Sequence, residues 1–325
     1  MEGIRSDQQL AIDRNSRPLV SVVIVADHDT DRHASLDDLR SCFQALASQE
    51  VDQPVEFLLA ETDERARKLP ADLIAALPGL RVLGVPHDGS YARKNAAVKA
   101  AKGEIIAILD ADCVPLSGWL QSLINTFLSH PQHVAVSGRT MYEGKTAIER
   151  CLAVLTRGYL DPGKEATTNY ISNNNAGILR SVWERFPLPE KEGPYAALLQ
   201  SAAIVRDGGH FIFQPAMTVI HEFDGWLMER DIRCHIGWAT IRIREIDPEL
   251  RFSWLLRLGQ ASIPLFYIGR VIESWATCFR VGKQYGFRLA DYPIAIGLTL
   301  LIHFLEIKGM VLAFSHQPVP ATRYR

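Results

Sequence analysis

A short apolar run that ends in two carboxylates constrains the fold of this chain most. The five residues from Ile105 to Leu109 are all apolar and rich in β-branched types, which predicts a strand buried on both faces, as in the middle of a parallel sheet. Asp110 and Asp112 follow directly. Ligands of open α/β sheets bind beyond the carboxyl ends of the strands, and alternate residues at a strand end point to the same side. The two carboxylates are therefore placed to share a hard divalent cation such as Mg²⁺ or Mn²⁺, which would hold a diphosphate.

Other interpretations of an Asp-x-Asp sequence fit this position less well. Two solvated turn residues are the usual explanation elsewhere, but here a buried strand precedes the pair. A calcium-binding loop needs further oxygen ligands and a glycine, whereas Cys113, Val114 and Pro115 follow. The nucleophilic aspartate of haloacid dehalogenases usually follows the first strand of the fold. Here a long α/β stretch precedes Asp110, so this interpretation also fits less well. The sequence contains neither a Gly-x-Gly-x-x-Gly fingerprint nor a Walker lysine loop, so neither a dinucleotide-binding fold nor a P-loop is indicated.

Length, charge and cysteine content limit the remaining classes. With 325 residues, 47% of them hydrophobic, the chain can form one large α/β domain with an appendage. A net charge of −2 excludes a generally basic nucleic-acid-binding protein, although residues 226–325 form a basic part with thirteen Lys and Arg against eight Asp and Glu. The five scattered cysteines include no Cys-x-x-Cys pair, and the first 18 residues lack the apolar core of a signal peptide. We therefore expect a cytoplasmic catalytic part without a zinc site or a disulfide framework.

Strand and helix patterns alternate along the first 110 residues. Apolar runs predict strands at residues 19–26, 55–60, 81–85 and 105–109, and helical spacing predicts helices at 36–47 and 90–101. This alternation indicates an α/β fold with a doubly wound, mostly parallel sheet. The carboxyl ends of its strands would bring four acidic residues to one rim: Asp27, Glu61, Asp110 and Asp112.

Taken in order, several segments resemble family 2 glycosyltransferases, which have the GT-A fold. They are residues 20–26, 55–63, 89–97, 103–115 and 118–120, followed by 172–183 and 215–221. The resemblance covers roughly residues 18–235. It implies a GT-A glycosyltransferase domain at 18–235 and leaves residues 236–325 as a helical, membrane-associated tail.

The resemblance implies a nucleoside diphosphate sugar as donor and a divalent metal, Mn²⁺ or Mg²⁺, as cofactor. A metal and a guanidinium would stabilise the charge that the diphosphate gains as the sugar departs. The implied contacts are Glu61 and Asp63 at the base and ribose, Arg93 and Asn95 in the nucleotide pocket, and Asp110 and Asp112 on the metal.

Two further segments carry candidate ligands. The family places a histidine where His221 ends an apolar strand, which makes His221 a candidate third metal ligand, although a lone histidine there is often structural. One of Asn173, Asn174 and Asn175, with Asn174 as the first candidate, is expected to hydrogen-bond the acceptor hydroxyls. The alternative for these asparagines is a polar turn.

The general base is the part of the family pattern that this sequence lacks. Inverting members usually carry an acidic pair before the closing strands, and residues 189–199 contain no such pair. Glu190 or Glu192 is the candidate base, since a base needs only hydrogen-bond reach and a suitable pKa; the alternative is that both are solvated. The resemblance as a whole implies an inverting, metal-dependent glycosyltransferase of the hexosyltransferase type. The alternative is a catalytically silent GT-A scaffold subunit of a membrane glycan-assembly complex.

The tail is rich in tryptophan and arginine and contains two apolar stretches, at about 255–272 and 294–314. Charged residues interrupt both, among them Arg270 in the first and Glu306 in the second. A membrane-spanning helix needs about 20 residues nearly free of charge, so amphipathic helices in the membrane interface fit better than spans. The alternative is a soluble helical bundle packed on the catalytic domain. The membrane interpretation implies a sugar or lipid-linked acceptor, cytoplasmic localisation at the membrane surface, and a role in polysaccharide biosynthesis.

Overall fold

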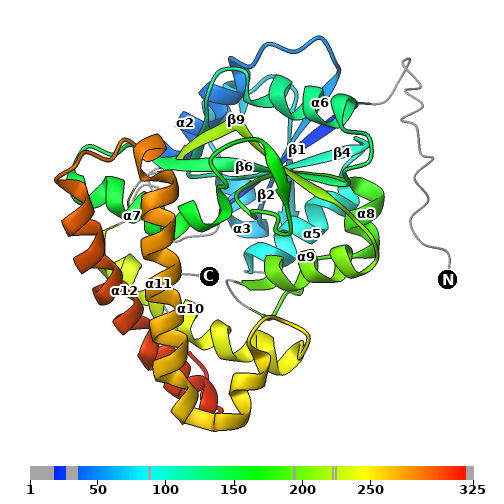
Figure 1. Ribbon diagram of the computed structural model, residues 1–325. Coiled ribbons are helices and arrows are strands. Elements are labelled where there is room, and N and C mark those ends of the chain that lie inside the picture. The colour runs from blue at the N-terminus through cyan, green and yellow to red at the C-terminus, as the bar shows by residue number, and fades with distance from the viewer. Residues whose placement is uncertain are drawn as a thin grey trace.

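The structure, a computed structural model, describes residues 18–26, 36–86, 89–192, 195–221, 223 and 225–319. Asp27, which we expected at the rim of the sheet, lies outside these residues. Within them, nine strands form one mixed sheet in the order β3-β2-β1-β4-β8-β6-β9-β5, and β7 pairs with β9 (Figure 1). The strands are β1 (Val20–Val25), β2 (Val55–Thr62), β3 (Leu80–Val85), β4 (Ile105–Asp110), β5 (Cys113–Pro115), β6 (Ala135–Tyr142), β7 (Ala166–Thr168), β8 (Asn175–Leu179) and β9 (Phe211–His221).

The first half of the sheet confirms the predicted parallel strands. β1 pairs in parallel with both β2 and β4, and β2 with β3. β2 runs two residues further than expected, through Glu61 and Thr62, and the Thr62 hydroxyl then caps α3 by accepting a hydrogen bond from the Arg65 N–H. Beyond β4 the sheet is mixed, because β8 lies antiparallel between β4 and β6. The α/β class is confirmed.

Helices cover both faces of the sheet. Ala107 and Leu109 of β4 pack into one buried cluster with α2 and α6, and Ile106 and Ile108 pack into a second one with α5, α8 and α9. β4 is thus buried on both faces, as its apolar run predicted. The helices of this part are α2 (Asp37–Ala47), α3 (Asp63–Lys68), α4 (Ala71–Ala75), α5 (Ser90–Ala100), α6 (Trp119–Ser129), α7 (Ala147–Arg157), α8 (Arg180–Arg185) and α9 (Ala196–Arg206).

The C-terminal residues form long helices beside the sheet domain: α10 (Trp226–Ile246), the 3₁₀ segment η3 (Ser253–Ser262), α11 (Ile263–Val281) and α12 (Asp291–Phe314) (Figure 1). α10 continues through the boundary expected between residues 235 and 236. A third apolar cluster joins α7 to α11 and α12. α10 and α12 cross closely at two glycines, since an added Cβ at Gly237 or Gly309 would lie 1.9 Å from a backbone carbonyl oxygen of the other helix. The tail therefore packs against the sheet domain.

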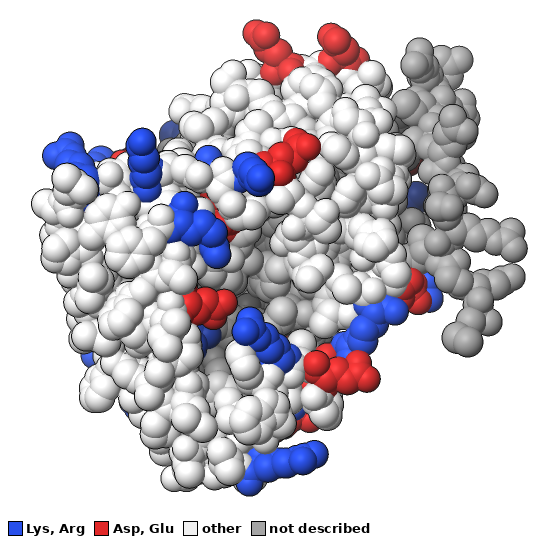
Figure 2. All heavy atoms as spheres, viewed as in Figure 1, with Lys and Arg blue, Asp and Glu red and all other residues white. Residues whose placement is uncertain are grey.

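α12 is, among the described residues, the helix long and apolar enough to cross a membrane. The core helix of a soluble protein passes the same test, and 39% of the apolar window is buried. Two polar residues in the middle of α12, His303 and Glu306, are buried, at 2% and 0% exposure. The exposed side is mainly apolar, with Phe304 on α12 and Phe279 on α11 more than 60% exposed, although Lys308 of α12 is exposed as well. Figure 2 shows few charged side chains on this part of the surface.

Candidate active site

A buried ion pair lies at the end of the central strand. Asp110 is the last residue of β4 and only 2% exposed, and its Oδ1 lies 2.7 Å from Nζ of Lys94 on α5. The same ammonium donates a hydrogen bond of 3.1 Å to the backbone oxygen of Asn173. Burying a carboxylate is costly unless a cation or hydrogen bonds compensate for the lost hydration, and Lys94 supplies the cation. Lys94 was not among the expected site residues, although a signal was present: it lies with Tyr91, Ala97 and Val98 on the buried face of α5.

Asp112 and His221 lie together next to this pair. Asp112 follows β4 in the turn to β5, and β5 pairs with β9 so that Cys113 lies opposite His221. Asp112 Oδ2 is 3.2 Å from His221 Nε2, and the imidazole stacks on the Tyr142 ring at 5.3 Å between centroids. Burial, Asp112 and Asp110 together raise the pKa of the Cys113 thiol well above its usual value. The negative charges of both carboxylates are therefore felt at Cys113.

The three expected metal ligands are thus divided. Asp112 and His221 are in contact, whereas Asp110 pairs with Lys94. The described residues contain no cluster of three or more His, Cys, Asp or Glu side chains that could hold a metal ion. One carboxylate and one imidazole still fit Mn²⁺ or Mg²⁺ if phosphate oxygens of a substrate complete the coordination, as is common for Mg²⁺ sites.

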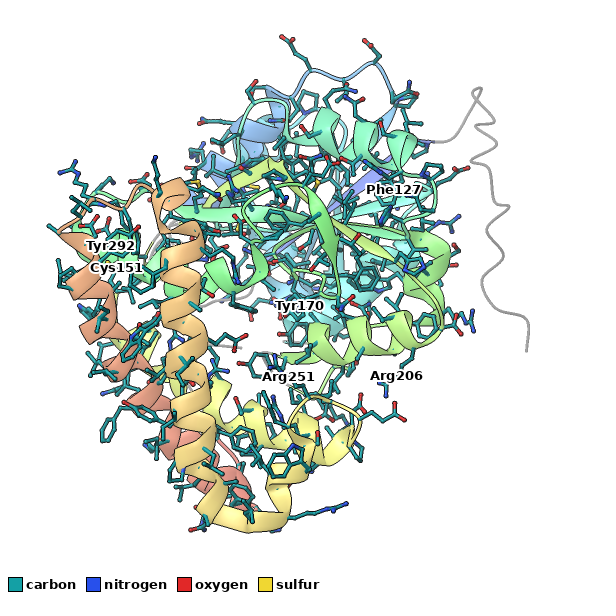
Figure 3. All side chains as sticks on the ribbon, in the orientation of Figure 1. Phe127, Cys151, Tyr170, Arg206, Arg251 and Tyr292 are labelled. Atoms are coloured by element: carbon teal, nitrogen blue, oxygen red, sulfur yellow. The ribbon has the colours of Figure 1, made fainter. Side chains whose placement is uncertain are left out.

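A cavity of about 160 Å³ opens beside Asp110, between the sheet domain and the tail. Figure 2 shows a hollow there, and Figure 3 places Tyr170 at the sheet-domain side of the space. Lining residues from the sheet domain include Tyr91, Asp110, Tyr142, Arg157, Tyr170, Ser172, Asn173 and Asn174, and those from the tail include Glu229, Arg233, Arg270, Glu273, Ser274 and His303. The tail helices are thus one wall of the candidate site, which the sequence did not predict.

Arg157, the last residue of α7, brings positive charge to the cavity. Its Nε is buried and has no hydrogen-bond partner among the described residues. Burial alone would lower the pKa of this guanidinium, but Tyr142, Tyr159, Cys113 and Asp110 raise it above its usual value. Arg157 therefore keeps a full positive charge with a donor to spare, which suits an anionic ligand.

Three other predicted residues lie at neighbouring strand ends and do not line this cavity. Arg93 is 2% exposed and donates a hydrogen bond to the backbone oxygen of Ala26 at the end of β1. Glu61 is buried at the end of β2 and accepts a hydrogen bond of 3.2 Å from the N–H of Thr62. Asp63 is exposed and lies over Gly84 of β3, where an added Cβ would be 2.4 Å from its Oδ1. Any nucleotide contact by Glu61 and Asp63 would lie toward the β2 and β3 side of the sheet.

Asn95, Glu190 and Glu192 line a different cavity, of about 800 Å³. The Asn95 amide donates to the Leu188 oxygen at 2.9 Å and to Glu190 Oε1 at 3.1 Å, and it accepts from Trp183 Nε1 at 3.0 Å. Successive helical residues point about 100° apart, so Lys94 faces Asp110 while Asn95 faces the loop. The Asn95 side chain thus holds the loop at 188–192 by hydrogen bonds, and neither Glu190 nor Glu192 lines the cavity beside Asp110.

The asparagines at 173–175 mainly shape the wall. The Asn174 side chain accepts a hydrogen bond from the Ser172 hydroxyl and donates to Thr140 Oγ1 at 3.1 Å. Its backbone oxygen accepts a hydrogen bond from the Asp110 N–H. Asn175 is fully buried, and its Oδ1 accepts a hydrogen bond from Trp119 Nε1. Asn173 and Asn174 line the cavity.

Comparison with known proteins places this geometry in a family. The sequence profile described as "Glycosyl transferase family 2" matches residues 21–186. The chain is 27% identical over 310 residues to glycosyltransferase AglE of Haloferax volcanii, covering 83% of this chain and 95% of that protein. The fold resembles that of the mannosyltransferase PcManGT from Pyrobaculum calidifontis, solved in complex with GDP-Man and Mn²⁺, with a TM-score of 0.53, 17% identity, and coverage of 94% of this chain and 90% of that one. Since the family profile spans half of the chain, the protein is a member of glycosyl transferase family 2 with a GT-A-like fold.

Proposed function

We propose that this glycosyltransferase moves a sugar from a nucleoside diphosphate donor to a hydroxyl acceptor with inversion, and that Asp112 and His221 bind a divalent metal. The observation that carries the proposal is the contact between these two side chains beside the buried pair of Asp110 and Lys94. Support comes from the fold, which is shared with a mannosyltransferase solved with GDP-Man and Mn²⁺.

The chain's own charges suit a departing diphosphate. A divalent cation, when bound, would supply Lewis-acid stabilisation of the leaving group. Arg157 would bind phosphate oxygens from the cavity wall, and this contact strengthens as the leaving group gains charge. Lys94 neutralises Asp110, which lowers the repulsion that a diphosphate would meet at the end of β4.

Donor turnover tests the proposal. We would incubate the full chain with GDP-mannose, UDP-glucose or UDP-N-acetylglucosamine, with and without Mn²⁺, and measure the nucleoside diphosphate released. Wild type should release it only with Mn²⁺, and Asp112→Ala should abolish the release. The matched control is Asp72→Ala, because the Asp72 side chain is 70% exposed and lies outside the site. Turnover by Asp112→Ala at the wild-type rate would refute the role of Asp112.

The scaffold alternative keeps one observation in its favour, since Glu190 and Glu192 do not line the cavity beside Asp110. A scaffold would bind the nucleotide without turning it over. Thermal unfolding with each donor separates the two functions, because a ligand that binds only the folded state raises the melting temperature. A raised melting temperature without any turnover would favour the scaffold.

We also propose that the tail attaches the enzyme to the cytoplasmic face of a membrane, where the acceptor is lipid-linked. The exposed apolar side chains of α11 and α12 support this, among them Ile272, Phe279 and Phe304. The test is flotation of the full chain with vesicles that contain anionic lipid at low salt. A protein that stays wholly in the soluble fraction would contradict the attachment.

A further inference from the structure

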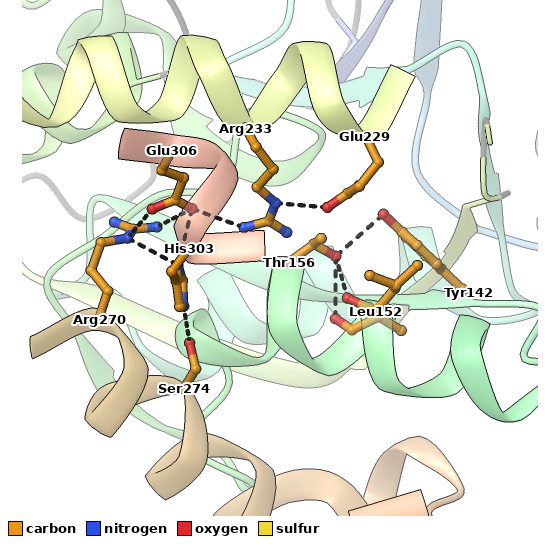
Figure 4. Close-up of polar contacts among 10 residues, drawn as sticks. Tyr142, Leu152, Thr156, Glu229, Arg233, Arg270, Ser274, His303 and Glu306 are labelled. Carbon is orange, nitrogen blue, oxygen red and sulfur yellow. Dashed lines mark hydrogen bonds and ion pairs between the residues drawn. The ribbon is translucent and has the colours of Figure 1, made fainter. Parts of the chain in front are cut away.

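The tail contains a row of three polar side chains, two of which line the cavity. Ser274 lies on α11, and His303 and Glu306 lie one turn apart on α12 (Figure 4). Ser274 Oγ is 2.8 Å from His303 Nε2, and His303 Nδ1 is 3.1 Å from Glu306 Oε1. Ser274 and His303 line the same cavity as Asp110, and Glu306 stands behind them with no exposed surface.

The neighbours of the imidazole determine which nitrogen carries its proton. Nδ1 faces a carboxylate oxygen at 3.1 Å, and a lone pair there would be repelled, so Nδ1 carries the hydrogen and donates it to Glu306. Arg270 Nε also approaches Nδ1, but at 3.4 Å, which is long for a hydrogen bond. Nε2 is then the acceptor, and the Ser274 hydroxyl donates to it. The Ser274 oxygen keeps lone pairs for a further donor.

The charges around this row balance each other. Glu306 lies 2.6 Å from Arg270 Nε and 3.2 Å from Arg233 Nη1, and Arg233 in turn pairs with Glu229 at 2.6 Å (Figure 4). Two arginines and two glutamates leave the set neutral when the imidazole is neutral. Burial lowers the pKa of His303; Glu306 opposes this effect, and Arg270 and Arg233 add to it. The imidazole is therefore unprotonated at neutral pH, the state that a base requires.

We propose that Ser274 and His303 form the proton relay that activates the acceptor hydroxyl, with Glu306 as the positioning residue. The inference rests on the proposed function. The acceptor oxygen forms a bond to the anomeric carbon while the bond from that carbon to the diphosphate breaks, and the electron pair of the broken bond leaves with the diphosphate. The acceptor proton passes to Ser274 Oγ as the Ser274 proton passes to His303 Nε2. His303 later returns this proton to solvent.

The relay supplies the general base, which the loop at 189–192 does not bring to this cavity. A hydroxyl nucleophile must lose its proton as it attacks, and a positioned base typically contributes 10²–10⁴-fold to the rate. Glu190 and Glu192 line the other cavity, whereas Ser274 and His303 line the same cavity as Asp110. The base would thus come from the tail, outside the segment that the family profile matches.

The test compares Ser274→Ala, Ser274→Thr and His303→Ala with the control Thr299→Val in the full chain. Thr299 is buried on α12 one turn before His303, and its hydroxyl donates to the Ala295 oxygen. The assay is release of nucleoside diphosphate from GDP-mannose, UDP-glucose or UDP-N-acetylglucosamine with Mn²⁺, with water as the acceptor. Binding of the corresponding nucleoside diphosphate is measured separately by calorimetry.

We expect Ser274→Ala and His303→Ala to lower kcat by about 10²-fold or more, with nucleoside diphosphate affinity changed less than threefold. Ser274→Thr, which keeps the hydroxyl, should retain more of the rate than Ser274→Ala, and Thr299→Val should stay near wild type. In wild type kcat should fall at low pH, with a midpoint below 6.5, and this limb should be absent in His303→Ala. Added imidazole should restore part of the His303→Ala rate.

Two results would overturn the relay. One is a rate for Ser274→Ala within threefold of the wild-type rate. This variant should fold, because it removes only one oxygen from a half-buried position. The other is an unchanged acid limb in folded His303→Ala. If wild type turns over none of the three donors, the proposed function fails and the relay fails with it, whereas normal turnover by all variants refutes the relay alone.

Discussion

The crossing of α10 and α12 gives a matched pair of substitutions on one helix. An added Cβ at Gly309 would lie 1.9 Å from the Cys234 oxygen and 2.6 Å from the Trp238 nitrogen. Backbone atoms cannot turn aside as a side chain can, so Gly309→Ala must push the helices apart by more than 1 Å. At Gly297 on the same helix an added Cβ meets no atom within 4 Å, and alanine there brings only its better helix propensity.

Overpacking of this kind costs about 1–3 kcal/mol, and the helix propensity of alanine returns at most about 1 kcal/mol. We expect Gly309→Ala to lower the free energy of unfolding by about 1–2 kcal/mol and Gly297→Ala to raise it by about 0.5–1 kcal/mol. Because Glu306 lies less than one turn before Gly309, the displaced helix should also shift His303. Donor turnover should therefore fall in Gly309→Ala and stay unchanged in Gly297→Ala.

Urea unfolding followed by circular dichroism measures both free energies, and release of nucleoside diphosphate measures turnover. The two variants share a helix and a chemical change, so a difference between them reports the close crossing. Equal stability of the two variants would refute the close approach of α10 and α12. Loss of stability in Gly309→Ala with full turnover would show that the position of α12 does not matter to the site.

Three further predictions concern the buried charges and the braced loop. Lys94→Met leaves Asp110 buried without its ammonium and should lower the free energy of unfolding by about 3–5 kcal/mol; the double variant with Asp110→Asn should recover part of this loss, as urea titration would show. Asn95→Ala should cost about 1–3 kcal/mol through the hydrogen bonds lost to the loop, without changing nucleotide affinity in calorimetry. Burial alone would raise the pKa of Glu306, but Arg270, His303 and Arg233 lower it to about 2. The ionised Glu306 should therefore add roughly 3 kcal/mol to the free energy of unfolding above pH 4.5, and this contribution should be lost as the pH falls toward 2. In Glu306→Gln the free energy of unfolding should change less with pH over this range.

The parallel half of the fold could be predicted because its signals are local. An apolar run such as 105–109 must be a strand buried on both faces, and the structure confirms it in β4. The acidic ends of neighbouring strands follow from the same pattern. The antiparallel insertion of β8 next to β4 depends on pairing between distant segments, and no local pattern carries that information.

The candidate site was predictable only where it lies next to a strand end. Asp112 and His221, which the resemblance named as candidate metal ligands, meet because β5 and β9 are neighbours. The same resemblance pointed to Arg93 and Asn95 on α5, while the side chain that reaches Asp110 belongs to Lys94, one residue away and turned by about 100°. A resemblance assigns a segment, whereas the helical rotation decides which side chain faces the site.

The contribution of the tail could not be predicted because its residues lie far from Asp110 in the sequence. Arg270 and Glu306 were noted as interruptions that weaken a membrane span. In the structure both lie on the buried polar side of apolar helices, where Arg270 lines the cavity and Glu306 lies behind it. Charges within an apolar stretch were therefore a usable signal, but only the fold shows what they face.

The central claim is that the end of β4 holds a metal and a diphosphate between Asp112, His221 and the tail. Crystals grown with GDP and Mn²⁺ test it most directly, because anomalous diffraction locates the manganese without assumptions about the ligand. We predict one manganese peak in coordination distance of Asp112 and His221, with the diphosphate facing Arg157. Manganese bound elsewhere, or GDP in the cavity beside Asn95 and Glu190, would contradict the account.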